Sequence, residues 1–247
     1  MKSIFRVNPF TYFLILIVLL CGYFNYFLVI LVILFFHEMG HILVIKLFHK
    51  RIKSIDILPF GAIIKLDLET NISSFKLLLI SLSGIMMQAL LYVPFFYLDK
   101  CGLISRLTYN IFLTYNSLIL LFNMIPMVPL DGSKAVASLF ELVMPYKLSL
   151  KVINVVSLVV ITLFIYFSDK TLSLVIIVGL LLKESIRLIR NHSYIFNNFL
   201  LERYLYGVEH KMVKRVRGIK DIYKNYYNFI NNIRESDVLR AKFKPFN

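Results

Sequence analysis

The stretch VILFFHEMGHILVIKLF, residues 32–48, decides which class of protein this sequence describes. With residues 24–31 it forms an apolar run long enough to cross a bilayer as a helix, which takes about 20 residues. Two histidines and a glutamate nevertheless stand near its middle, at His37, Glu38 and His41. Polar groups inside a membrane are costly unless an ion or a water-filled cavity compensates them. The stretch therefore predicts a polar site within a membrane helix.

Apolar runs of similar length recur along the chain. Hydrophobic residues make up 59% of the sequence, whereas a soluble domain holds roughly 45–50%. The pattern predicts an all-α polytopic membrane protein with about six transmembrane helices, at 9–22, 24–48, 74–98, 107–125, 151–167 and 171–189. Five spans are an alternative, as is a cleaved signal peptide at the N-terminus. A retained first helix is favoured because no small-residue cleavage site follows Leu20.

The charge distribution indicates a topology. The chain carries a net charge of +14, which by itself is also compatible with a nucleic-acid-binding protein. With six spans, all Lys and Arg except Lys100, Arg106 and Lys170 fall on one side, as the positive-inside rule expects. We therefore expect cytoplasmic N- and C-termini, with a membrane domain at 1–190 and a basic cytoplasmic tail at 191–247. The tail would meet anionic lipid or an acidic partner. We expect no nucleic-acid partner. The two cysteines, Cys21 and Cys101, would both lie near the outer face. They are either two unpaired thiols or a disulfide, which requires an oxidising compartment.

The longest polar interruption, residues 49–73, predicts local β-structure. Its β-branched and alternating apolar residues are broken by Pro59-Phe60-Gly61. This pattern is typical of two short strands around a turn, a hairpin-like insertion between the second and third spans. The segment 57–68 could offer a strand edge to an extended peptide, so Gly61 becomes a candidate substrate-binding residue.

The spacing of the histidines predicts a metal site. On a helix, His37 and His41 lie one turn apart on the same face and can bind one ion, while Glu38 points about 100° away. Zinc commonly takes imidazole nitrogen and four ligands, of which a catalytic site leaves one to water. A third protein ligand is therefore needed. The alternative is a pair of histidines that bond to the backbone or to each other.

The segment FNMIPMVPLDGSK, residues 122–134, offers that third ligand. Pro126 and Pro129 break the helix before it, and irregular backbone at membrane depth is tolerated where it is buried in protein or lines a cavity. Asp131 is therefore a candidate metal ligand. The alternative is that Asp131 only caps the helix that follows.

A zinc ion with Glu38 beside it is suited to hydrolysis. Bound zinc activates water and polarises a carbonyl, and Glu38 could act as the general base. Two other classes of function remain: a membrane metal transporter with a transit site at His37, His41 and Asp131, and an inactive scaffold. Neither repeats nor several intramembrane carboxylates are visible, which disfavours a transporter.

These motifs resemble a known family. HEMGH at 37–41 and FN-x2-P-x2-P-LDG at 122–132 are similar to the motifs of the site-2 protease family of intramembrane zinc metalloproteases, peptidase family M50. RIKSIDILPFG at 51–61, NMIPMVPLDG at 123–132 and LLERYLYG at 200–207 resemble its sporulation branch, whose protease processes pro-sigma-K. The resemblance implies one zinc ion held by His37, His41 and Asp131, Glu38 as the base, and substrate contacts from Asn123 and from Pro126.

The resemblance also implies partners and a location. The substrate would be a membrane-associated, pro-sigma-factor-like protein, with membrane inhibitor proteins as further partners. The protein would lie in a bacterial cell membrane, the outer forespore membrane if the sporulation branch applies. The alternative within the family is a general site-2 protease that cleaves an anti-sigma factor. Two departures stand out: Gly84-Ile85 replaces the Gly-Pro of many relatives, and the 40 residues after Gly207 are too few for the nucleotide-binding CBS domain common in that branch.

Overall fold

The computed structural model describes residues 5–7, 11–12, 16, 18, 20–58, 61–66, 71–168, 171–208 and 212–244 of the 247-residue chain. These residues form two compact units. The first comprises Met1–Glu69 and Leu79–Met124, and the second comprises Thr70–Leu78 and Ile125–Asn247. Each unit is treated separately below.

Helix α2, Phe24–Leu47, carries the HEMGH sequence in the first unit. The helix ends where His49 adopts a left-handed backbone, with φ of 54°. The N–H groups of His49 and Lys50 then donate to the carbonyls of Lys46 and Ile45, respectively. These bonds satisfy two carbonyl groups of the last helical turn. The predicted span 24–48 is therefore one uninterrupted helix.

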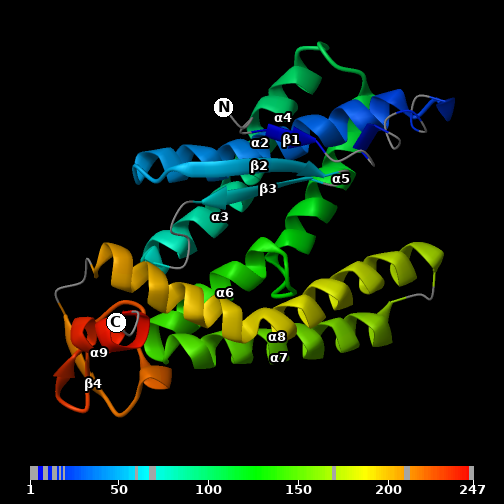
Figure 1. The fold of residues 1–247 in the computed structure, drawn as a ribbon. Helices are drawn as coiled ribbons and strands as arrows, with labels where there is room; N and C mark the ends of the chain where they lie inside the picture. Colours follow the sequence, from blue (N-terminus) through cyan, green and yellow to red (C-terminus); the bar gives the residue numbers. More distant parts are fainter. Residues whose placement is uncertain are drawn as a thin grey trace. The chain divides into compact units, whose positions relative to one another are not determined.

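A three-stranded sheet contacts α2 in the order β1-β2-β3, and Figure 1 shows β2 and β3 running alongside that helix. Strands β2, Ile52–Leu58, and β3, Gly61–Leu66, are antiparallel, with Ile55 opposite Ile64. This confirms the two strands predicted around Pro59-Phe60-Gly61. Strand β1, Phe5–Val7, adds to β2 in parallel, although the basic N-terminal segment gave no strand signal.

Three further helices contribute to the first unit: α3, Ser74–Leu90, from Leu79 onward; α4, Tyr92–Lys100; and α5, Arg106–Met124. A turn at Leu91 separates α3 from α4, so the predicted span 74–98 is two helical segments that together reach Lys100. The core is made by α2, α4 and α5 around Ile33 and Phe112, both fully buried, with the ring of Phe95 stacked on Phe112 at 3.7 Å between centroids.

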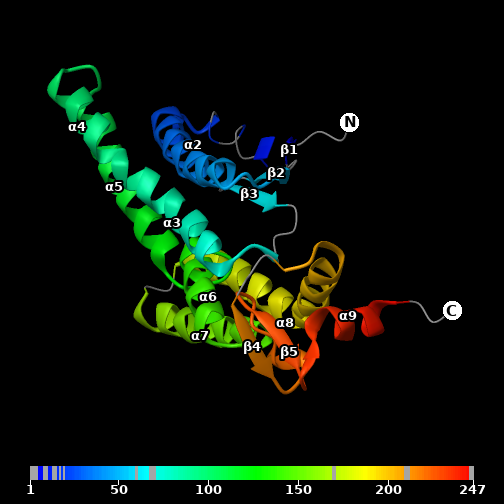
Figure 2. The ribbon, with the colours of Figure 1, turned by 90° about the vertical axis from the view of Figure 1, so that its left-hand side faces the viewer.

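The second unit is built on α6, Asp131–Val143; α7, Tyr146–Phe167; and α8, Leu172–Tyr206. Helices α7 and α8 pack side by side, as both views show (Figures 1 and 2). Helix α8 begins with Thr171, whose Oγ1 accepts the N–H of Leu174, and ends before Gly207, whose positive φ of 73° suits glycine. The helix thus continues well beyond residue 189, where the predicted sixth span ended.

Residues 212–244, named here the C-terminal module, are folded. They contain β4, Val213–Val216; a 3₁₀ turn η2, Ile219–Asp221; β5, Tyr227–Ile230; β6, Ile233–Arg234; and α9, Glu235–Phe243. Strand β5 pairs in parallel with β4 and antiparallel with β6. Ile222, Ile230 and Leu239 of the module share one buried core with residues of α7 and α8. Sequence reasoning gave this segment no regular structure.

In the described part of the chain, three helical segments are long and apolar enough to cross a membrane: Phe24–Leu47, Ser74–Lys100 and Tyr146–Phe167. They point large apolar side chains outward, such as Phe35 on α2 and Leu163 on α7, as helices in contact with lipid do. The six-span count stays a prediction, and most of the proposed first span, 9–22, lies outside the described residues. Cys21 and Cys101 are both exposed free cysteines.

Candidate metal centre

His37 and His41 form a tight pair on the buried side of α2. Their side chains are 4% and 7% exposed, and their Nε2 atoms lie 3.2 Å apart. The spacing of four residues places both rings on one helical face, as the sequence predicted. The two rings meet edge to face, with centroids 4.9 Å apart.

The other nitrogen of each ring has an acceptor from α3. Nδ1 of His37 lies 3.1 Å from Oε1 of Gln88, and Nδ1 of His41 lies 2.7 Å from the carbonyl oxygen of Ile80. Because both oxygens accept, each Nδ1 carries the proton and donates it. That assignment makes Nε2 the nitrogen of each neutral ring whose lone pair can bind a metal ion.

The distance between the two Nε2 atoms suits one shared ion. Two nitrogens bound to a tetrahedral zinc at about 2.0–2.1 Å lie about 3.3 Å apart, close to the 3.2 Å between His37 and His41. Two Nε2 lone pairs this close repel each other, and a cation between them removes the repulsion. The donor atoms therefore fit a zinc ion.

Helix α3 approaches the two rings so closely that only glycine fits at position 84. A Cβ on Gly84 would overlap the ring of His41 and lie 2.9 Å from Cε1 of His37. On the facing helix α2, a Cβ on Gly40 would lie 2.5 Å from the carbonyl oxygen of Ser83 on α3. The structure shows that this packing is directed at the histidine pair.

Gln88 connects the pair to a third helix. Its Oε1 faces Nδ1 of His37, while its Nε2 donates to the carbonyl of Asn116 on α5 at 2.9 Å. The Nδ2 of Asn116 donates back to the carbonyl of Gln88 at 3.4 Å. Both side chains are fully buried. Gln88 is not among the site residues predicted from the sequence, because its partners are distant in the sequence.

The remaining candidates of the first unit lie on three elements. Glu38 follows His37 on α2 and is half-buried. Asn123 is in the last turn of α5 and is also half-buried, and Gly61 opens β3. In the described sheet β3 is an edge strand, since β2 lies in the middle of the order β1-β2-β3.

Asp131 belongs to the second unit, where it is the first residue of α6. The residue at the N-cap is Leu130, whose side chain makes no capping hydrogen bond. The Asp131 side chain is buried, and its Oδ1 accepts a bond from Nζ of Lys134 at 2.9 Å. Residues 125–130, with Pro126 half-buried, form the irregular segment that the prolines predicted.

Comparisons with known proteins show which proteins this chain resembles. Residues 23–102 match the model of peptidase family M50. The chain is 28% identical over 262 residues to Stage IV sporulation protein FB of Bacillus subtilis (strain 168), covering 96% of this chain and 91% of that protein. These two likenesses support an intramembrane metalloprotease, and residues 23–102 are similar to peptidase family M50.

A solved structure supports the fold of this metalloprotease. The site-2 protease from Methanocaldococcus jannaschii matches with a TM-score of 0.51 at 19% sequence identity, covering 80% of this chain and 89% of that one. At this identity the likeness concerns the fold alone.

The helix that begins with Asp131 is tied to the C-terminal module of the metalloprotease. Near its other end, Oε2 of Glu141 accepts bonds from Nζ of Lys224 at 2.9 Å and from Oγ of Ser74 at 2.7 Å. Nδ2 of Asn225 donates to the Ser74 hydroxyl and to the Glu141 carbonyl. The module therefore holds α6 through a buried polar network.

A second buried ion pair joins the module to α8. The guanidinium of Arg203 pairs with Glu235, and it also donates to the carbonyls of Lys224 and Tyr226. Asn228 donates its backbone N–H to the same Glu235 carboxylate. A buried guanidinium and carboxylate that satisfy each other's hydrogen bonds hold α8 and the module in one relative orientation.

Proposed function

We propose that this metalloprotease uses one zinc ion to hydrolyse a peptide bond in or near the membrane segment of a membrane-associated regulatory protein. The observation that carries the proposal is the histidine pair on α2. Its Nδ1 atoms face acceptors on α3, and its Nε2 atoms lie 3.2 Å apart. Fixed Nδ1 donors orient both rings so that each offers Nε2 to the same ion.

The third zinc ligand in this proposal is Asp131. Its support is the sequence motif and its chemistry, because a carboxylate oxygen completes two imidazole nitrogens and leaves one position for water. The Asp131 carboxylate accepts a hydrogen bond from Lys134. Because the Lys134 side chain is exposed to water, this ion pair is weak and a metal ion could displace the lysine. A bound metal ion would then neutralise the negative charge of Asp131 in place of Lys134.

In the proposed reaction, Glu38 moves the protons. When bound, zinc lowers the pKa of water toward about 7 and polarises the scissile carbonyl. The carboxylate of Glu38 takes a proton from the attacking water and then gives it to the nitrogen of the leaving amine. Its position one residue after His37 keeps it beside the ligands without making it one.

A substrate helix hides its carbonyls in its own hydrogen bonds, so the scissile segment has to be extended. We infer that the edge strand β3, which begins at Gly61, pairs with this segment by strand addition. Strand β3 contacts α2, the helix of the histidine pair. Asn123 would hold the substrate backbone with its amide, and Pro126 would shape the same part of the site.

The substrate class proposed is a pro-sigma-factor-like protein. The support is the match with Stage IV sporulation protein FB, which extends over nearly the whole chain. In this case the protease would lie in the outer forespore membrane, with cytoplasmic termini and with membrane inhibitor proteins as partners. The alternative substrate is an anti-sigma factor or another membrane-held regulator, and the same site would serve both.

The experiment that tests the proposal is co-expression with a pro-sigma-K-type substrate, with zinc measured in the purified proteases. Glu38→Gln should abolish cleavage and keep zinc. Asp131→Asn should lose both. The matched controls are Glu184→Gln on α8 and the exposed Asp221→Asn on η2, which should keep both. Each control removes one carboxylate outside the proposed metal centre.

Each result has a distinct meaning. If the native chain holds zinc but leaves the substrate intact, the substrate class is wrong and the metal centre stands. Zinc retained in Asp131→Asn would exclude Asp131 as a ligand. If the native chain holds no zinc, the proposed metal centre is wrong.

A further inference from the structure

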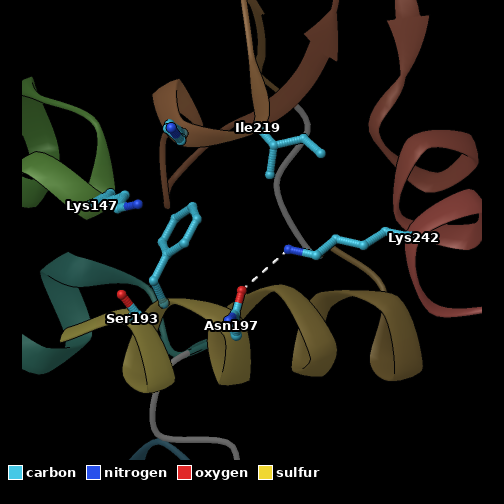
Figure 3. Close-up of a pocket in the computed structure, with 7 residues that line it drawn as sticks. Lys147, Ser193, Asn197, Ile219 and Lys242 are labelled. Carbon is cyan, nitrogen blue, oxygen red and sulfur yellow. Dashed lines mark hydrogen bonds between the residues drawn. The ribbon is translucent and has the colours of Figure 1, made fainter. Parts of the chain in front are cut away.

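A pocket of about 310 Å³ lies in the second unit, between α8, the start of α7, η2 and α9. Its lining includes three lysines, Lys147, Lys220 and Lys242, together with the polar side chains of Ser193 and Asn197. The buried ring of Phe196 also lines it. Figure 3 shows Lys147 and Lys242 on opposite sides of the pocket, with Asn197 on α8 between them. The volume lies at the lower end of the range of small-molecule sites.

The charges of this pocket are all positive. Among the residues that the structure describes, its lining holds no carboxylate, and none of the three lysines forms an ion pair there. The Lys242 side chain is exposed, yet partial desolvation, and then repulsion from Lys147, lower its pKa from the usual value. The Lys242 ammonium donates to Oδ1 of Asn197 at 3.2 Å, and that of Lys147 lies 5.2 Å from the centroid of the Phe196 ring. An anion would relieve the repulsion between these ammonium groups.

The pocket is built at one end of a membrane helix. Lys147 is the second residue of α7, which is long and apolar enough to cross a bilayer. Nearby on α7 and α8, Lys151, Arg187 and Arg190 are exposed. Basic residues gather at the end of a spanning helix where lipid headgroups lie, and basic pockets between such helices bind anionic headgroups.

We propose that this pocket binds a phosphate group, as an anionic phospholipid presents it at the membrane surface. Several phosphate oxygens can accept bonds at once from the ammonium groups of Lys147, Lys220 and Lys242, with further donors in the Ser193 hydroxyl and the Asn197 amide. A single carboxylate of an acidic peptide would satisfy fewer of these donors. The pocket is independent of the proposed zinc chemistry, which involves none of its residues.

The test compares two double variants of the full chain in neutral detergent. Lys147→Gln with Lys242→Gln removes two charges from the pocket. Lys151→Gln with Lys244→Gln removes two exposed charges from the same two regions, outside the pocket. Native mass spectrometry measures binding of a short-chain phosphatidylglycerol, with phosphatidylcholine as the neutral lipid. We expect the pocket variant to lose at least about tenfold in affinity for phosphatidylglycerol and the control to change little.

Competition identifies the source of the phosphate group. Displacement of phosphatidylglycerol by millimolar inorganic phosphate would show that a free phosphate also occupies the pocket, and failure to displace it would assign the site to lipid. Equal affinities of the two double variants would overturn the proposal, as would binding of a glutamate-rich peptide in place of both phosphate ligands. Should the pocket variant fail to fold, Asn197→Asp replaces it. This exposed position would then carry a carboxylate that pairs with Lys242 and excludes the anion.

Discussion

Nζ of Lys224 lies 2.9 Å from Oε2 of Glu141, and both side chains are buried. The two residues are 83 positions apart in the sequence. One belongs to the C-terminal module, and the other to α6, the helix that begins with the proposed zinc ligand Asp131. A buried ion pair is strongly sensitive to loss of one partner, because the remaining charge stays in a poorly solvating environment. The ion pair therefore links the C-terminal module to α6, the helix that carries the candidate ligand Asp131.

Lys224→Met should destabilise the second unit. Glu141 would keep its bond from Ser74 but lose its counter-charge, at a cost of about 3–5 kcal/mol. Thermal unfolding of the purified chain measures the loss, and Lys244→Met, at an exposed position of the same module, is the control. The double variant Lys224→Met with Glu141→Gln should recover part of the stability, since no unpaired charge remains. Equal melting of Lys224→Met and Lys244→Met would contradict the importance of the pair.

Gln88→Leu should weaken metal binding without removing a ligand. The acceptor for Nδ1 of His37 would be lost, and the ring would no longer be held in its tautomer and orientation. We expect zinc affinity, measured by chelator competition, to fall by about 10–100-fold. Gln88→Glu keeps an acceptor and should bind zinc more tightly than Gln88→Leu. The exposed Met86→Leu on the same helix is the control. Unchanged affinity in Gln88→Leu would show that His37 needs no positioning from α3.

Gly84→Ala should disrupt the histidine pair. Its Cβ would overlap the ring of His41, and overpacking of this kind costs about 1–3 kcal/mol of stability. Zinc content and cleavage should both fall. Gly179→Ala on α8 is the matched control, because a Cβ there meets no atom within 4 Å. It should be neutral or gain up to about 1 kcal/mol from the better helix propensity of alanine. Normal zinc binding by the Gly84→Ala protein would contradict the close contact between α3 and the two histidine rings.

Proline substitutions test the proposed substrate edge of β3. Successive backbone N–H groups of a strand point to opposite sides, so Ile64→Pro and Lys65→Pro remove donors from different edges. One variant loses a bond to β2, and the other loses a donor from the open edge, where proline is tolerated in a sheet. We expect the better-folded variant of the two to bind zinc normally and still to cleave poorly. Normal cleavage by both variants would exclude strand addition at β3.

Much of the first unit was predictable from local patterns. The spacing of His37 and His41 needs only helix periodicity, and the structure confirms that both rings lie on one face of α2. The hairpin β2–β3 was predicted because β-branched runs flank a proline and a glycine, which are strong local signals. Strand β1 was missed because three residues carry too little pattern, and its pairing with β2 spans about 50 positions.

The sequence by itself determined the membrane class, the histidine pair and the irregular segment before Asp131, since each depends on residue types a few positions apart. The role of Asp131 as a ligand stays a prediction. Only the tertiary structure revealed Gln88 and Gly84 as supports of the histidine pair, the folded C-terminal module and the lysine-lined pocket. These features join residues that are far apart in the sequence, such as Lys224 with Glu141 and Lys147 with Lys242. No local periodicity encodes such contacts, because they depend on which helix faces meet after folding.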